Sequence, residues 1–76
     1  MPRIIVKLWP GKSEQQKQKL AEGVTKAFMT SLGYCEASVS VSLQEVPSGE
    51  WTEKVYKPDV INGPGKLYKR PGYEPL

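Results

Sequence analysis

The chain has 76 residues, of which 38% are hydrophobic, so it has room for one domain over residues 1–76 and for no second core. It contains a single cysteine, Cys35, and no histidine, which excludes a disulfide framework and argues against a Cys/His metal site. A lone subunit of this size is marginally stable, and we therefore expect a homo-oligomer.

The charge balance argues against a nucleic-acid partner. Eleven Lys and Arg against eight Asp and Glu give a formal net charge of +3, and the basic residues form no consecutive block. A small acidic substrate suits this balance better. No apolar run reaches the length of a signal peptide or a membrane span, so we expect a cytoplasmic protein with no membrane contact.

The first predicted element is a strand over residues 2–9, where β-branched residues are frequent and apolar positions alternate. One face carries Ile4, Val6 and Leu8, and the other carries Arg3, Ile5, Lys7 and Trp9. Pro10 and Gly11 end the strand, because proline cannot donate to the ladder and the pair favours a turn.

A helix of about nineteen residues is predicted next. Ser13 and Gln16 match a capping box, and Glu14 suits the positive helix end. Gly33 is placed to end the helix in the left-handed conformation. The apolar positions recur at three- and four-residue steps, which predicts one stripe facing a sheet: Leu20, Val24, Ala27, Phe28 and Leu32.

Residues 38–43 alternate serine with Val39, Val41 and Leu43, which predicts a second strand. Strand, helix and strand then form a right-handed crossover with parallel strands, an α+β fold whose helix covers the apolar strand faces. The opposite sheet face and the open strand edges need another subunit to complete the sheet.

The C-terminal part is less regular. We predict a loop over residues 44–49, a short helix over residues 51–57 ended by Pro58, and an extension that contains Tyr73. Arg70 and Tyr73 are able to reach a neighbouring subunit's pocket, although docking of the tail on the body or on a neighbour is the simpler expectation.

This layout resembles the tautomerase superfamily. The motifs are the Met-Pro start, the Pro-Gly-Lys-Ser-Glu-Gln-Gln-Lys helix entry, and the Ser-Val-Ser-Val strand that leads to Gly-Glu-Trp. The length, the Leu-Gln-Glu run and the Lys-Arg-Pro-Gly-Tyr ending are similar to the bacterial tautomerase PptA group of the 4-oxalocrotonate tautomerase family.

The resemblance implies a cofactor-independent and metal-free keto–enol isomerase. Pro2, freed when Met1 is removed, matches the family's amino-terminal general base and acid. Lys12 aligns with a substrate-binding arginine but lacks its bidentate fork. The second family arginine aligns with Ser40, so the diacid specificity of the hexameric members does not carry over. Trp51 aligns with an aromatic pocket wall.

A free amine is needed for this chemistry, because an α-amino group has a pKa near 7.7–8.0 and proline's secondary amine is more basic. Desolvation by Trp51 and positive charge from Arg3 and Lys12 would lower that pKa toward neutrality. Arg3 lies on the face away from the helix, so a role in subunit pairing is its alternative.

Two alternatives stay open at this point. The first is a noncatalytic binding or regulatory protein on the same fold, suggested by the loss of both expected arginines. The second concerns assembly: the family contains dimers and trimers of dimers, and the extended tail favours a dimer over a hexamer. Phenylenolpyruvate is the expected substrate type.

Overall fold

The computed structural model describes residues 1–73. The chain divides into two compact units, Met1–Glu45 and Val46–Leu76, and each is described by itself.

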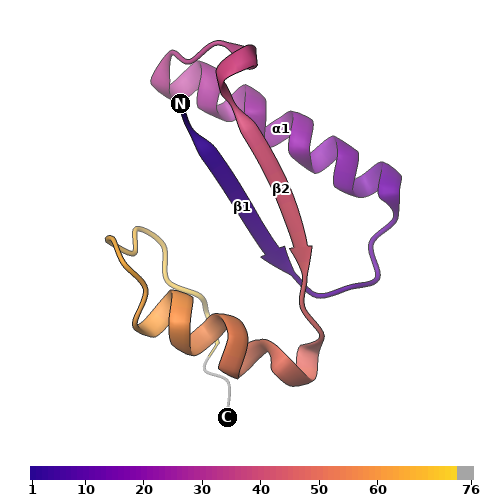
Figure 1. Cartoon of the computed structure of the whole chain (residues 1–76), viewed down its shortest axis with the longest axis vertical. Helices are drawn as coiled ribbons and strands as arrows, with labels where there is room; N and C mark the ends of the chain where they lie inside the picture. The colour runs from indigo at the N-terminus through magenta and orange to yellow at the C-terminus, as the bar shows by residue number, and fades with distance from the viewer. Residues whose placement is uncertain (74–76) are drawn as a thin grey trace. The chain divides into compact units, whose positions relative to one another are not determined.

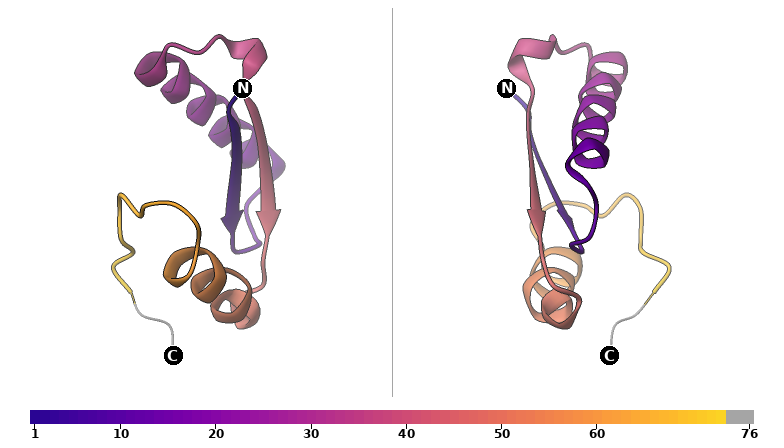
Figure 2. Two further views of the ribbon diagram at one scale, coloured as in Figure 1. Left: turned by 60° about the vertical axis from the view of Figure 1, so that its left-hand side comes forward. Right: turned by 90° about the vertical axis from the view of Figure 1, so that its right-hand side faces the viewer.

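The first unit contains two strands and one long helix. Strand β1 (Arg3–Leu8) is followed by helix α1 (Glu14–Leu32) and strand β2 (Ser40–Glu45) (Figure 1). The strands pair in parallel, with Arg3 opposite Ser40 and Leu8 opposite Glu45. Helix α1 lies on one side of this two-stranded sheet (Figure 2). The predicted β-α-β unit with parallel strands is confirmed, and within one chain its sheet is open at both edges.

The alternation of the strands is also confirmed. Ile4 pairs with Val41 and Val6 with Leu43, and all four side chains are half-buried. The predicted boundaries of the second strand were wrong at both ends. Residues 36–38 form a 3₁₀ turn, η1 (Glu36–Ser38), and the strand extends through residues 44 and 45 because β1 is long enough to pair with them.

Helix α1 begins and ends where the sequence predicted. The Ser13 hydroxyl accepts from the Gln16 amide at 3.1 Å, and the Gln16 side chain accepts from the Ser13 amide at 3.0 Å. Gly33 has φ 76°, and its amide donates to the Met29 carbonyl at 3.1 Å. Both helix ends are therefore satisfied by local hydrogen bonds.

The predicted apolar stripe of α1 was only partly right. Val24 and Phe28 are half-buried, but the other three predicted positions, Leu20, Ala27 and Leu32, are exposed. The half-buried positions follow a line shifted around the helix: Lys17, Ala21, Val24, Thr25, Phe28 and Met29. Lys17 fits on this line because its ammonium bonds Glu14 at 2.9 Å and Glu45, at the end of β2, at 3.6 Å.

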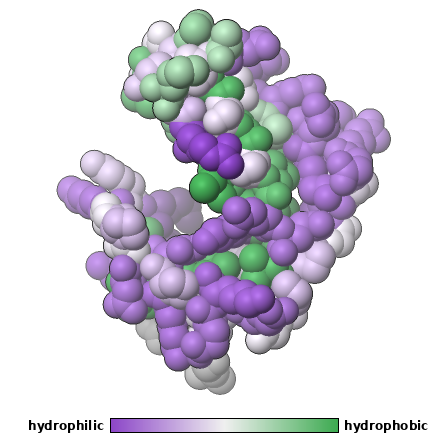
Figure 3. Space-filling view, viewed as in Figure 1, coloured by the Kyte–Doolittle hydropathy of each residue, from purple (hydrophilic) through white to green (hydrophobic). Residues whose placement is uncertain are grey.

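The first unit has no fully buried side chain within residues 1–45. On the sheet face opposite α1, apolar surface gathers over the strands (Figure 3). Ile5 and Trp9, which the alternation assigned to this face, are 50% and 58% exposed. A unit that leaves this much apolar surface uncovered lacks most of the core that a stable domain requires.

The second unit is built around a helix that is longer and wider than predicted. The 3₁₀ turn η2 (Ser48–Glu50) leads into a π-helical segment, η3 (Thr52–Ile61). Pro58 lies inside η3, so the prediction that it ends the helix was wrong. In an α-helix the proline ring would collide with the carbonyl four residues earlier, and the wider turn relieves that crowding. Lys54 pairs with Glu50 along this segment.

The chain reverses direction after η3 at two glycines. Gly65 has φ 89°, a conformation that glycine adopts without strain. A Cβ atom at Gly63 would collide with the backbone carbonyl of Asp59. Within residues 1–73, no helix is both long enough and apolar enough to cross a membrane.

Candidate active site

Pro2 lies at the start of the first strand. Its carbonyl accepts a hydrogen bond from the Ser40 amide at 3.3 Å, which anchors its backbone beside the start of β2. The Pro2 side chain is half-buried, whereas Met1 is 96% exposed. The candidate base is thus held on the sheet, and the residue that would have to be removed projects into solvent.

Arg3 is held across the sheet by two serines of β2. Its guanidinium donates to the Ser42 hydroxyl at 3.1 Å and to the Ser40 hydroxyl at 3.4 Å. These acceptors are neutral, so the two bonds orient the guanidinium without cancelling its charge. The alternating serines that predicted a strand therefore also position a cation one residue from Pro2.

Lys12 lies between β1 and α1, at the end of β1 that is far from Pro2 (Figure 1). The six residues of β1 rise about 3.3 Å each, which separates the two ends of the strand by on the order of 17 Å. Lys12 lines a shallow pocket of about 260 Å³ with Leu8 and Leu20. The structure therefore does not bring Lys12 and Pro2 of one chain into one site.

Trp51 belongs to the second unit, where its indole Nε1–H donates to the Tyr73 hydroxyl at 3.0 Å. The Tyr73 ring lies 6.0 Å from the Tyr56 ring, centroid to centroid, at an interplanar angle of 40°. This places Trp51 at the edge of an aromatic cluster formed with the tail. Its predicted role as a pocket wall stays a prediction.

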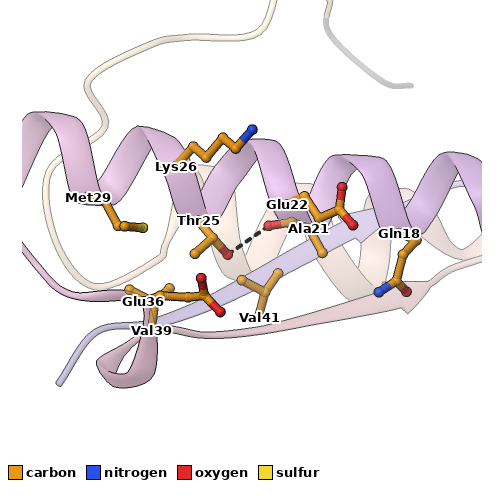
Figure 4. Close-up of a pocket in the computed structure, with 9 residues that line it drawn as sticks. All are labelled: Gln18, Ala21, Glu22, Thr25, Lys26, Met29, Glu36, Val39 and Val41. Atoms are coloured by element: carbon orange, nitrogen blue, oxygen red, sulfur yellow. Dashed lines mark hydrogen bonds between the residues drawn. The ribbon is translucent and has the colours of Figure 1, made fainter.

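A groove in the first unit has a volume of about 510 Å³ and lies between α1 and β2 (Figure 4). Thr25 lines it and donates to the Ala21 carbonyl at 2.8 Å. None of the predicted site residues lines this groove. Among residues 1–73, no three side chains of the acidic, cysteine or histidine type gather in a way that would hold a metal ion.

The family model described as "Tautomerase enzyme" matches residues 2–54, which is more than half of the chain and begins at Pro2. This chain belongs to the tautomerase family. It is therefore an isomerase that interconverts tautomers, as the resemblance implied.

Curated relatives support this assignment over the whole length. The tautomerase is 42% identical over 76 residues to a probable tautomerase of Xylella fastidiosa (strain 9a5c), covering 100% of this chain and 93% of that one. It is 37% identical over 75 residues to tautomerase PptA of Cronobacter sakazakii (strain ATCC BAA-894), covering 97% of this chain and 99% of that one.

Solved structures show the same fold. TomN, a 4-oxalocrotonate tautomerase homologue in the tomaymycin biosynthetic pathway, aligns with a TM-score of 0.64 at 36% identity, over 66% of this chain and 77% of its own. DmpI from Helicobacter pylori aligns with a TM-score of 0.59 at 40% identity, over 62% and 79% of the two chains. The resemblance to the 4-oxalocrotonate tautomerase group is thereby confirmed.

Two features of this tautomerase were not predicted from the sequence. One is the Arg3 contact with Ser40 and Ser42, which the parallel register and the shared strand face would have indicated. The other is the pairing of Trp51 with Tyr73, for which residues 22 positions apart in an irregular tail carry no periodic signal.

Proposed function

We propose that the secondary amine of Pro2, freed by removal of Met1, is the general base and acid of this tautomerase. The substrate is a small carboxylate-bearing enol such as phenylenolpyruvate. The observation that supports this most directly is the family match, which begins at Pro2. The Pro2 carbonyl is also hydrogen-bonded to the second strand, while Met1 is almost fully exposed to solvent.

The chemistry moves one proton and needs no change of oxidation state. The amine lone pair takes the hydroxyl proton of the enol, and the oxygen electrons form the carbonyl group. The electrons of the carbon–carbon double bond then accept a proton from the ammonium, which regenerates the amine. While Met1 is attached, the Pro2 nitrogen is a tertiary amide without a basic lone pair, so that form is inactive.

The environment of Pro2 supports a free amine at neutral pH. Arg3 is adjacent in sequence, and its guanidinium is bonded to neutral hydroxyls rather than to a carboxylate. A neighbouring positive charge disfavours the ammonium form and lowers the amine pKa, and partial burial of Pro2 acts in the same direction. The same cation would stabilise the negative charge of an enolate.

The active form is a homo-oligomer, with a dimer favoured over a hexamer. The open sheet edges, the exposed Ile5 and Trp9 and the absence of a fully buried side chain in residues 1–45 all support association. Because β1, on the order of 17 Å long, separates Lys12 from Pro2, we assign the role of Lys12 in carboxylate binding to the site of another copy.

The deciding experiment measures ketonisation of phenylenolpyruvate by Met1-free protein and by its Pro2→Ala variant. We expect kcat/KM to fall by about 10²- to 10⁴-fold in the variant, the range of general acid–base catalysis. Pro10→Ala, which changes a proline of the turn after β1, is the matched control and is expected to keep activity. If the processed wild type is no faster than buffer, or Pro2→Ala matches it, a noncatalytic binding role becomes the better explanation.

A further inference from the structure

The second unit contains a pocket of its own, formed where the tail folds back over η3. It has a volume of about 430 Å³, within the range of roughly 300–1,000 Å³ that is usual for small-molecule sites. Tyr56 and Val60 of η3 line it together with Leu67, Arg70 and Tyr73 of the tail.

The apolar part of this pocket is suited to an aromatic ring. The Tyr56 and Tyr73 rings are tilted by 40° with centroids 6.0 Å apart, which is within the distance at which aromatic rings attract one another. Leu67 and Tyr73 remain 45% and 48% exposed. A ring placed between them would cover apolar surface that the folded chain leaves in water.

The polar part is a single cation, Arg70. Within the residues that the structure describes, no carboxylate forms an ion pair with its guanidinium. The neighbouring cation Lys66 instead lies 5.3 Å from the ring centroid of Tyr68, and neither residue lines the pocket. A guanidinium binds a carboxylate through two parallel hydrogen bonds, which an ammonium does not match.

We propose that this pocket, named the tail pocket (Tyr56, Val60, Leu67, Arg70 and Tyr73 with the glycine turn between them), binds an aromatic monocarboxylate. The ring lies against Tyr56, Leu67 and Tyr73, and the carboxylate accepts from Arg70. The proposal concerns binding alone, so it stands or falls separately from the role of Pro2.

The structure supplies a reporter for this binding. Trp51 donates to the hydroxyl of Tyr73, a wall residue, so a ligand that displaces or reorders Tyr73 changes the environment of the indole. Trp9 belongs to the other unit, and in a Trp9→Phe background Trp51 is the one tryptophan of the 76-residue chain. Its emission can then be followed as ligand is added to the intact protein.

The experiment titrates Met1-free Trp9→Phe protein with 3-phenylpropionate, which has the ring and the acid but no enol. Saturable change in Trp51 emission is expected. The uncharged amide 3-phenylpropionamide and the ringless acid butyrate are each expected to bind at least about tenfold more weakly. The amide lacks the carboxylate that accepts from Arg70, and butyrate lacks the aromatic ring.

Arg70→Gln is expected to weaken 3-phenylpropionate binding by at least about tenfold, and Arg70→Lys to weaken it less, because charge is kept but the fork is lost. Lys69→Gln is the matched control: it removes the same charge from the next residue, which does not line the pocket, and should leave binding unchanged. Unchanged Trp51 emission without ligand verifies that each variant keeps the tail folded. No saturable signal, equal binding of acid and amide, or equal loss in Arg70→Gln and Lys69→Gln would each overturn the proposal.

Discussion

Each of the two units of this tautomerase is stabilised internally by a different kind of interaction. The first unit is stabilised by regular secondary structure: two paired strands with alternating side chains and a helix capped at both ends. An ion pair joins Lys17 of the helix to Glu45 at the end of β2. In the second unit, order comes from single contacts, chiefly Trp51 with Tyr73 and the crowded turn at Gly63. We therefore expect single substitutions at these contacts to disturb the second unit more than single substitutions disturb the first.

The two proposed sites also belong to different units. Pro2, Arg3 and Lys12 belong to the first unit, and the tail pocket belongs to the second unit. The first unit carries the exposed Ile5 and Trp9 on its outer sheet face, so we expect its chemistry to depend on association with another copy. The predictions below test these contrasts in order of expected effect.

The largest effect is expected from mixing two impaired variants. Pro2→Ala and Lys12→Ala each lose activity if both residues serve one site. If that site combines Pro2 of one chain with Lys12 of another, equal mixing recovers about a quarter of the wild-type activity in a dimer, because half of the dimers are mixed and one of their two sites is intact. The measurement is phenylenolpyruvate ketonisation after subunit exchange.

The unmixed variants are the controls for that measurement. No recovery on mixing would place Pro2 and Lys12 in the same chain's site, against the separation along β1. Full activity of Lys12→Ala alone would remove Lys12 from the site altogether.

The next largest effect is expected at the turn of the second unit. Gly63→Ala places a methyl group against the Asp59 carbonyl, which backbone movement must relieve, at a cost of about 1–3 kcal/mol in the free energy of unfolding. Gly72→Ala is the control, because a Cβ there meets nothing within 4 Å. Urea denaturation followed by Trp51 emission in the Trp9→Phe background measures both, and equal stability of the two variants would show that the turn is not crowded.

A smaller effect is expected at the start of α1. Ser13→Ala removes the acceptor of the Gln16 amide and the capping box, which lowers the free energy of unfolding by about 0.5–2 kcal/mol. Ser31→Ala, in the last turn of the same helix, is expected to change stability little. Circular dichroism at fixed protein concentration follows both variants, and a Ser13→Ala protein as stable as wild type would show that water replaces the cap at no cost.

Most of the first unit was predictable because its determinants are local and periodic. The capping box, Gly33 and the strand alternation each act within a few residues, so their signals are legible in one sequence. The helix stripe was wrong at Leu20, Ala27 and Leu32, because periodicity identifies apolar positions but not which of them face the chain's own sheet. The wider helix around Pro58 was missed because the α-helix rule for proline does not cover a π-helical turn.

The candidate site was predictable only in part. Pro2 and Trp51 were proposed through the family resemblance, while the serine acceptors of Arg3 followed from neither the motif nor the resemblance. The tail pocket was not predicted, since its walls come from η3 and from a segment without periodicity. Contacts between residues far apart in the sequence produce no periodic pattern of residue types.

By itself, then, the sequence determined the order of strand, helix and strand, the ends of α1, the face on which each strand side chain lies and the position of Pro2 next to the start. These follow from hydrogen bonds and periods that span a few residues. Only the tertiary structure decided that Arg3 bonds two serines and that Arg70 and Tyr73 of the tail line a pocket together with residues of η3. These features depend on how the strands pair and where the chain reverses direction. Both are determined by contacts between residues that are far apart in the sequence.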